Sequence, residues 1–105
     1  MELSKLENQI ITDVYDADMS PGMSFEIQNY KLEEKDPNDK KHEFAFYLGK
    51  LKKLGFIKYE EKEAFLKGGS HSIKYNNNVK RVCEDKIHID SEGIKLVEEA
   101  NKTIL

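Results

Sequence analysis

The chain has 105 residues, of which 38% are hydrophobic and 35% are charged, and its formal net charge is −3. This balance is typical of a single folded domain with a solvent-rich surface and excludes a disordered chain. No stretch approaches the ~20 apolar residues of a membrane-spanning helix, and the lone cysteine, Cys83, excludes an internal disulfide. A cytoplasmic protein is therefore expected, and a membrane partner is not.

The first predicted element is an amphipathic helix over about residues 4–17. Apolar residues recur there at three- and four-residue spacing, with acidic residues between them. Ser20-Pro21-Gly22 prevents the helix from continuing. Phe25 and Ile27 then alternate with polar neighbours, which favours a short strand over a poorly formed second helix.

The central helix is predicted more sharply, because both of its ends carry suitable residues. Asp36 can cap a helix whose first position is Pro37, and Gly55 suits the left-handed residue that ends it. Lysines fill its last turns, where cations suit the helix dipole. One apolar stripe consists of Phe44, Tyr47, Leu48, Leu51 and Leu54.

Short strands and turns are predicted after the central helix. A strand begins at once over 56–59, and Gly68-Gly69-Ser70 and Asn76-Asn77-Asn78 are predicted as turns. The remaining strands are expected at 73–75, 79–83 and 87–89. Asp90 is then expected to cap a last helix over about 91–104. The buried side of that helix is predicted to consist of Ile94, Val97, Ala100 and Ile104.

This order of elements predicts a single α+β domain over residues 1–105. The fold expected is a winged helix-turn-helix, with three helices and a β-hairpin wing. The helix directly before the hairpin would be the recognition helix. The core is expected to include Leu6, Ile10, Val14, Leu48, Leu51, Ile57, Ile87, Ile89 and Val97.

Two motifs carry a resemblance to known proteins. The residues LGKLKKLGFI at 48–57 resemble the end of winged-helix recognition helices. The residues KIHIDSEGIKLVEEAN at 86–101 resemble the start of the helix after the wing, with Gly93 at the glycine position and Asp90 where threonine is usual. With these motifs the chain resembles the small YjcQ-type proteins of Gram-positive bacteria and their phages. The resemblance is poor over 18–38 and 60–85, and it implies the fold but no activity.

Positive charge is concentrated in the middle of the sequence. Residues 1–39 carry a net charge of −7, residues 40–86 carry +6 and residues 87–105 carry −2. The recognition helix and the wing fall in the basic part, which predicts a surface that binds double-stranded DNA. The alternative is a lysine-rich face that only keeps the protein soluble. The candidate DNA-binding residues are Lys40, Lys41, His42, Lys50, Lys52, Lys53, Lys74, Lys80 and Arg81.

The central helix supports DNA binding only in part. Its outward side, opposite the apolar stripe, is expected to carry His42, Phe46, Gly49 and Lys53. The helix has no Arg, Asn or Gln within 40–54 to read bases, and Asp39 and Glu43 would repel phosphate. An outward Phe46 favours contact with a protein instead. A winged-helix interaction module that does not bind DNA is therefore the alternative function.

Catalytic and metal-binding roles are not expected. Cys83 lies five residues before His88, and the other two histidines are elsewhere, which is not the spacing of zinc ligands. We therefore predict no enzyme activity, no metal and no cofactor. The expected state is a monomer, or a homodimer that pairs through its terminal helices with Ile104 and Leu105 extending the contact.

Overall fold

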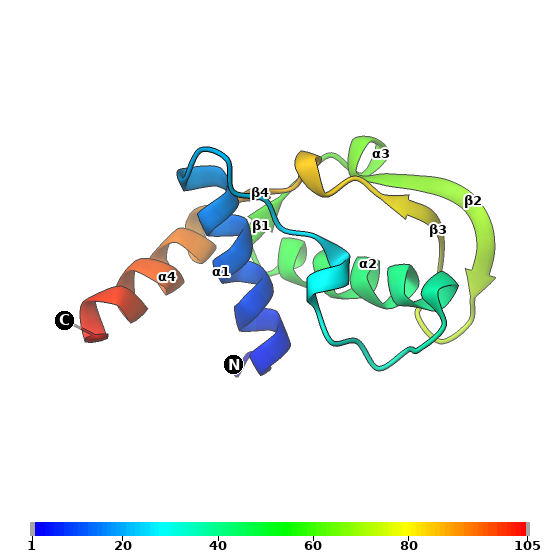
Figure 1. The fold of residues 1–105 in the computed structure, drawn as a ribbon, viewed down its shortest axis with the longest axis horizontal. Helices are drawn as coiled ribbons and strands as arrows, with labels where there is room; N and C mark the ends of the chain where they lie inside the picture. The colour runs from blue at the N-terminus through cyan, green and yellow to red at the C-terminus, as the bar shows by residue number, and fades with distance from the viewer. Residues whose placement is uncertain (1, 105) are drawn as a thin grey trace.

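The computed structural model describes the backbone of residues 2–104 and the side chains of residues 2–36 and 39–101. In chain order its elements are α1 (Lys5–Met19), the 3-10 turn η1 (Ile27–Asn29), α2 (Pro37–Lys53), β1 (Ile57–Lys58), α3 (Glu61–Ala64), β2 (Phe65–Ser72), β3 (Asn77–Val82), the 3-10 turn η2 (Glu84–Lys86), β4 (His88–Ile89) and α4 (Ser91–Ile104) (Figure 1). They form a small α+β domain with an antiparallel hairpin, which is compatible with the predicted winged-helix order. The described residues contain one helix more than the three predicted, because α3 adds a single turn before the hairpin.

Local capping explains where the long helices begin and end. At the start of α1 the Ser4 hydroxyl accepts a hydrogen bond from the Glu7 N–H (3.1 Å), and the Glu7 carboxylate accepts one from the Ser4 N–H (2.9 Å). At the end of α2, Gly55 adopts φ 81°, and the N–H groups of Gly55 and Phe56 donate back to carbonyls of the last helical turn. The three predicted helices are confirmed to within two residues of their expected ends.

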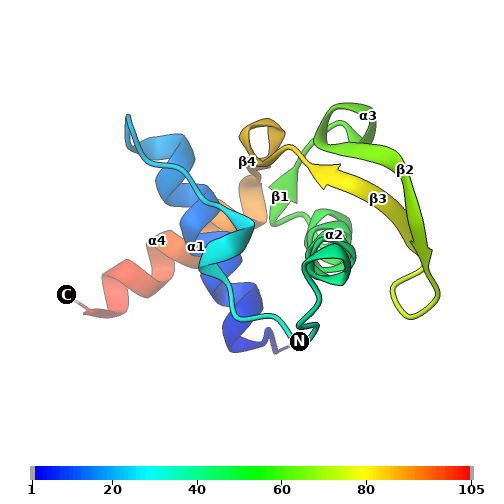
Figure 2. The ribbon, with the colours of Figure 1, turned by 45° about the vertical axis from the view of Figure 1, so that its right-hand side comes forward.

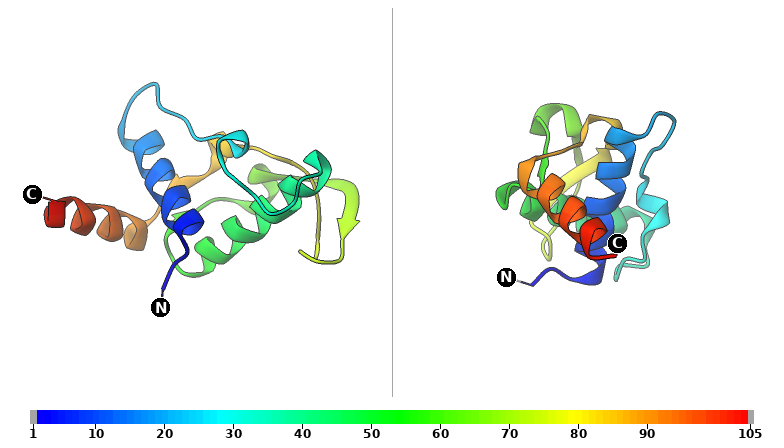
Figure 3. Two further views of the ribbon diagram at one scale, coloured as in Figure 1. Left: turned by 60° about the horizontal axis from the view of Figure 1, so that its bottom comes forward. Right: turned by 90° about the vertical axis from the view of Figure 1, so that its left-hand side faces the viewer.

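Two separate ribbons follow α2. β1 pairs antiparallel with β4, with Ile57 opposite Ile89, and this short ribbon links the end of α2 to the start of α4. β2 and β3 form the hairpin, which is inserted between β1 and β4 in the chain. The hairpin curves along α2 on one side of the domain (Figures 1 and 2), whereas α4 projects from the opposite side (Figure 3).

Most of the residues predicted to form the core are buried in the structure. Eight of the nine expected core residues are buried: Ile10, Val14, Leu48, Leu51, Ile57, Ile87, Ile89 and Val97. Leu6 is only partly buried at the margin of the core. Ala100 is exposed, contrary to its prediction, because α4 extends away from the rest of the domain (Figure 3). The predicted roles of Ile104 and Leu105 lie outside the described side chains.

The segment after α1 is not the strand that its alternating pattern predicts. Phe25 is buried, and its ring centroid lies 6.5 Å from that of Phe44. The chain then enters η1 instead of pairing with another strand, because the Ile27 N–H donates to the Glu84 carboxylate (2.8 Å). The alternating pattern therefore comes from the buried ring of Phe25 followed by the single 3-10 turn η1.

The hairpin also differs from its prediction. Gly68-Gly69-Ser70 lies inside β2, where the first glycine has φ 117°. The turn occupies 73–76, so it covers the strand predicted over 73–75 and only the first residue of the turn predicted over 76–78. The turn forms there because Asn76 adopts a left-handed conformation (φ 53°) and the Ser72 hydroxyl accepts a hydrogen bond from the Tyr75 N–H (3.1 Å). The glycines instead allow an irregularity in the pairing of β2 with β3.

Candidate nucleic-acid interface

A groove of about 980 Å³ lies between α2 and the β2–β3 hairpin, whose relative positions are seen in Figure 2. α2 lines one side of it from Ala45 onward, and the hairpin lines the other as far as Val79. Two lining rings, those of Tyr59 and Phe65, pack against each other with centroids 5.1 Å apart. The lysines that line the groove are Lys50, Lys52, Lys53 and Lys67.

Both sides of this groove come from segments without acidic residues. Residues 44–59 contain four lysines, residues 65–82 contain three lysines and one arginine, and neither segment contains Asp or Glu. Among the described residues that line the groove, Glu61 is the only acidic one. The groove therefore lies between two segments of net charge +4 each, in a protein whose overall net charge is −3.

Two neighbouring lysines of α2 are placed to contact a ligand in the groove. The Lys52 ammonium lies 4.6 Å from the centroid of the Tyr59 ring, a cation–π distance. Burial and the nearby Glu61 carboxylate raise the pKa of Tyr59 to about 12, so the phenol stays protonated at neutral pH and adds no negative charge. Lys53 is exposed and makes no ion pair with any described residue. Both ammonium groups therefore remain available to an anion.

A third lysine of α2 that lines the groove, Lys50, is held by an ion pair with α1. Its ammonium lies 3.0 Å from the carboxylate of Glu7, which is buried in α1. Burial alone would raise the pKa of the Glu7 carboxyl, but hydrogen bonds from Ser4 and from Lys50 outweigh it and lower the pKa below 4.5. Lys50 thus connects the groove to α1.

This carboxyl is expected to contribute to the acid limit of stability. A lowered pKa in the folded state stabilises the fold at pH values above 4.5, and the contribution is lost as the pH falls through the folded-state value. The free energy of unfolding, measured with urea, should therefore fall less in Glu7→Gln than in the parent when the pH is lowered from neutral to below 4.5. Glu98→Gln, at an exposed position of α4, is the control. Parallel pH profiles for the parent and Glu7→Gln would contradict this role of Glu7.

His42 does not lie on the outward face that its place in the helix predicts. Only 1% of it is exposed, because the turn end of the hairpin lies against this part of α2. The Asn77 side chain donates a hydrogen bond to the His42 carbonyl (3.1 Å). Neither ring nitrogen of His42 makes a hydrogen bond with a described residue, and Nδ1 lies 3.5 Å from the Asp39 carboxylate. The prediction that His42 faces a ligand is therefore wrong for this conformation.

The other candidate residues are divided over the surface. The Lys74 ammonium lies 3.0 Å from the Glu34 carboxylate and 3.8 Å from that of Glu33, and the bond to Glu34 raises the pKa of Lys74. Lys40, Lys41 and Lys80 do not line the groove, and Arg81 lines a different one. The structure thus brings together three of the nine candidates at this site: Lys50, Lys52 and Lys53.

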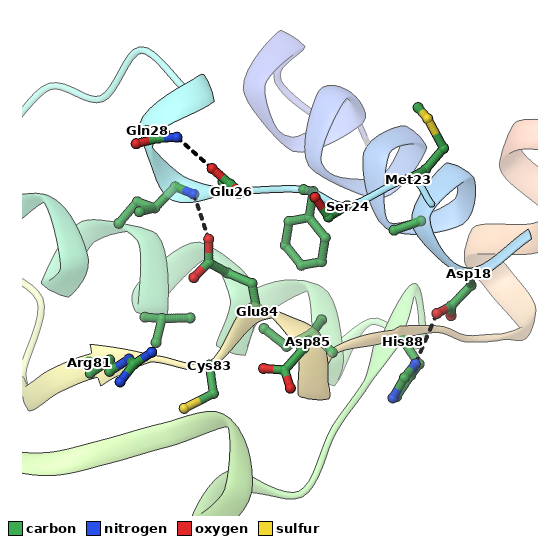
Figure 4. A pocket seen from close by; sticks show the side chains of 15 residues that line it. Asp18, Met23, Ser24, Glu26, Gln28, Arg81, Cys83, Glu84, Asp85 and His88 are labelled. Atoms are coloured by element: carbon green, nitrogen blue, oxygen red, sulfur yellow. Dashed lines mark hydrogen bonds and ion pairs between the residues drawn. The ribbon is translucent and has the colours of Figure 1, made fainter. Parts of the chain in front are cut away.

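A second groove, of about 610 Å³, holds Cys83, His88 and Asp18 (Figure 4). His88 Nδ1 lies 2.9 Å from one Asp18 oxygen, and the other Asp18 oxygen accepts a hydrogen bond from the Ile89 N–H (2.6 Å). Figure 4 shows the Cys83 thiol and the His88 ring apart from each other, with Asp85 between them. The Asp18–His88 pair therefore joins α1 to β4 and does not activate the thiol.

Sequence reasoning missed most of the aromatic residues in the basic groove. Phe46 is 46% exposed, as predicted, but its ring centroid lies 5.6 Å from that of Tyr75 in the hairpin. Tyr59 and Phe65 also reach the groove, from separate elements. No spacing in the sequence relates these rings, because they approach one another only after the hairpin folds back along α2.

Comparison with protein-family models, with curated proteins and with solved structures gives no match for this chain. No helix in the part of the chain that the structure describes is long and apolar enough to cross a membrane. The fold and the groove together define the class as a small α+β domain with a basic cleft between a helix and a hairpin. The resemblance to YjcQ-type proteins stays a prediction.

Proposed function

We propose that this chain is a winged-helix protein that binds duplex DNA, with α2 as its recognition helix and the β2–β3 hairpin as its wing. One observation carries the proposal: two basic segments without acidic residues, 44–59 and 65–82, line a single groove from both sides. Lysines that neutralise phosphates release counterions, and this supplies the sequence-independent part of DNA affinity. A transcription regulator of bacterial or phage origin is the role that fits this proposal.

Contacts to phosphate are expected to dominate over contacts to bases. α2 offers no Arg, Asn or Gln within 40–54, and its residues 42–45 are all buried. A recognition helix usually reads bases with its N-terminal residues in the major groove, and here that part of the helix is covered. We therefore expect binding that depends steeply on salt and discriminates weakly between sequences.

Replacing Lys52 and Lys53 together by alanine tests the proposal. If each contacts one phosphate, the variant should bind any duplex about thirtyfold more weakly at ~0.15 M salt. The slope of log affinity against log salt should also flatten by about two units. Fluorescence anisotropy with a labelled duplex at several salt concentrations measures both quantities.

The control is the double variant Lys5→Ala with Lys95→Ala. It changes the net charge by the same amount as the test variant, but on α1 and α4, away from the groove. This control should keep the affinity and the salt slope of the parent. Equal losses in both double variants would mean that only net charge matters, and would contradict a DNA site in the groove.

A protein partner is the second candidate, and the half-exposed ring of Phe46 favours it. Phe46 and Tyr75 together place aromatic surface at the groove, where it could pack against an apolar side chain. Binding of that kind would depend little on salt. A strong loss of partner binding in Phe46→Ala, with Lys52→Ala and Lys53→Ala unchanged, would favour this candidate over DNA.

A further inference from the structure

The pairing of the β2–β3 hairpin is interrupted part of the way along its length. Near the base Lys67 pairs with Val79, but the next pair toward the turn is Ser72 with Asn77. Four residues of β2 therefore lie opposite one residue of β3, and Gly68 within this irregularity has φ 117°. A bulge that contains glycines provides a place where a hairpin bends. The irregularity therefore divides the hairpin into a base and an outer half.

The outer half of the hairpin, residues 70–78, is tied by charge to the loop before α2. Lys74, in the turn, is ion-paired with Glu34 and Glu33, which lie on that loop. Ile73 beside it is 92% exposed, so this residue adds little apolar burial to the contact. Exposed ion pairs are weak and are screened by salt, so this part of the attachment is sensitive to salt and to competing anions.

Beneath this outer half lies His42, a residue of α2 outside its core stripe. His42 is 1% exposed. The Asn77 amide reaches the His42 carbonyl, and the Tyr75 ring lies against that of Phe46. Neither His42 ring nitrogen makes a hydrogen bond within the described residues, although Nδ1 lies 3.5 Å from the Asp39 carboxylate. Only Nε2 is enclosed without a polar contact, so the contacts at the turn help to hold the closed arrangement.

We infer that the outer half of the hairpin is a lid over the N-terminal half of α2, held closed by the ion pairs of Lys74 with Glu33 and Glu34. Its effect on DNA binding rests on the function proposed above. With the lid closed, Lys74 is occupied, His42 is enclosed, and only the C-terminal half of α2 faces a ligand. A phosphate group that replaces the two carboxylates at Lys74 opens the lid and adds the N-terminal half of α2 to the contact surface.

The lid is tested first without DNA, by the reactivity of a single thiol placed beneath it. In a Cys83→Ser background, His42→Cys reacts with dithionitrobenzoate only when the lid opens. Lys74→Glu should raise the reaction rate about fivefold, since it replaces attraction by repulsion at an exposed pair. The reversed pair, Lys74→Glu with Glu34→Lys, should restore the slow rate. Equal rates in all of these proteins would overturn the inference.

The effect on DNA is tested with two double variants of equal charge. Glu33→Gln with Glu34→Gln removes the partners of Lys74, whereas Glu60→Gln with Glu63→Gln removes two carboxylates elsewhere. The first variant should bind a duplex about fivefold more tightly than the second. Equal affinities would overturn the lid as a regulator of DNA binding. A parent protein that binds no duplex would overturn the proposed function instead, and the thiol rates would still decide whether the lid exists.

Discussion

Gly93→Ala is expected to destabilise the domain by about 3 kcal/mol, near the upper end of the usual cost of overpacking a core. A methyl group at this position would lie 2.3 Å from the Phe56 carbonyl oxygen and 2.5 Å from Cδ1 of Ile89. The carbonyl cannot rotate away as a side chain does, and it already accepts a hydrogen bond from the Asp90 N–H (3.0 Å). Relief therefore requires α4 to shift away from the β1–β4 ribbon. Urea unfolding of the variant and the parent measures the loss.

The matched control is Gly49→Ala, at the glycine inside α2. The nearest atom to a methyl group there is the Tyr59 hydroxyl oxygen at 3.9 Å, an ordinary contact distance. Alanine in a helix interior is more stable than glycine by roughly 0.5–1 kcal/mol, so this variant should gain stability. The two substitutions are thus expected to have opposite signs. A neutral Gly93→Ala would show that α4 does not pack as closely on the ribbon as the structure has it.

The long helices could be predicted from the sequence because their ends depend on nearby residues. Gly55 ends α2 through its own positive φ and hydrogen bonds to the preceding turn, and Pro37 starts the helix through its fixed backbone angle. Gly93 shows the limit of the same reasoning. The sequence shows a glycine near the start of the last helix, but the reason for it, a backbone carbonyl from another element, is visible only in the structure.

The hairpin and the face of α2 were predicted less well because they depend on contacts between distant residues. The glycines at 68–69 suit a turn or a bulge equally, and the actual turn at 73–76 depends on a bond between a serine hydroxyl and the backbone. A helical wheel places His42 opposite the core stripe, and it cannot show that a hairpin more than thirty residues later covers that side. The structure therefore brings together only the candidate residues in the C-terminal half of α2, Lys50, Lys52 and Lys53.

Glu43→Ala is expected to destabilise the domain by about 3 kcal/mol through the loss of two charge-assisted hydrogen bonds. Glu43 is fully buried in α2, and its two carboxylate oxygens accept hydrogen bonds from the N–H groups of Glu33 (3.0 Å) and Glu34 (2.8 Å). The sequence suggested that Glu43 would repel phosphate, but its charge is used inside the protein. It fixes the loop that carries the two partners of Lys74, so stability and closure of the hairpin depend on the same carboxylate.

Glu43→Gln separates the number of hydrogen bonds from the size of the side chain. Its amide oxygen can still accept from one of the two N–H groups, so it should lose about half as much stability as Glu43→Ala in urea unfolding. Both variants should also speed the reaction of the thiol at His42→Cys, because the loop no longer holds Glu33 and Glu34 beside Lys74. Glu98→Ala, an exposed helical position, should change neither quantity. A loss below about 0.5 kcal/mol in Glu43→Ala, the size usual for surface sites, would contradict the anchoring of this loop by α2.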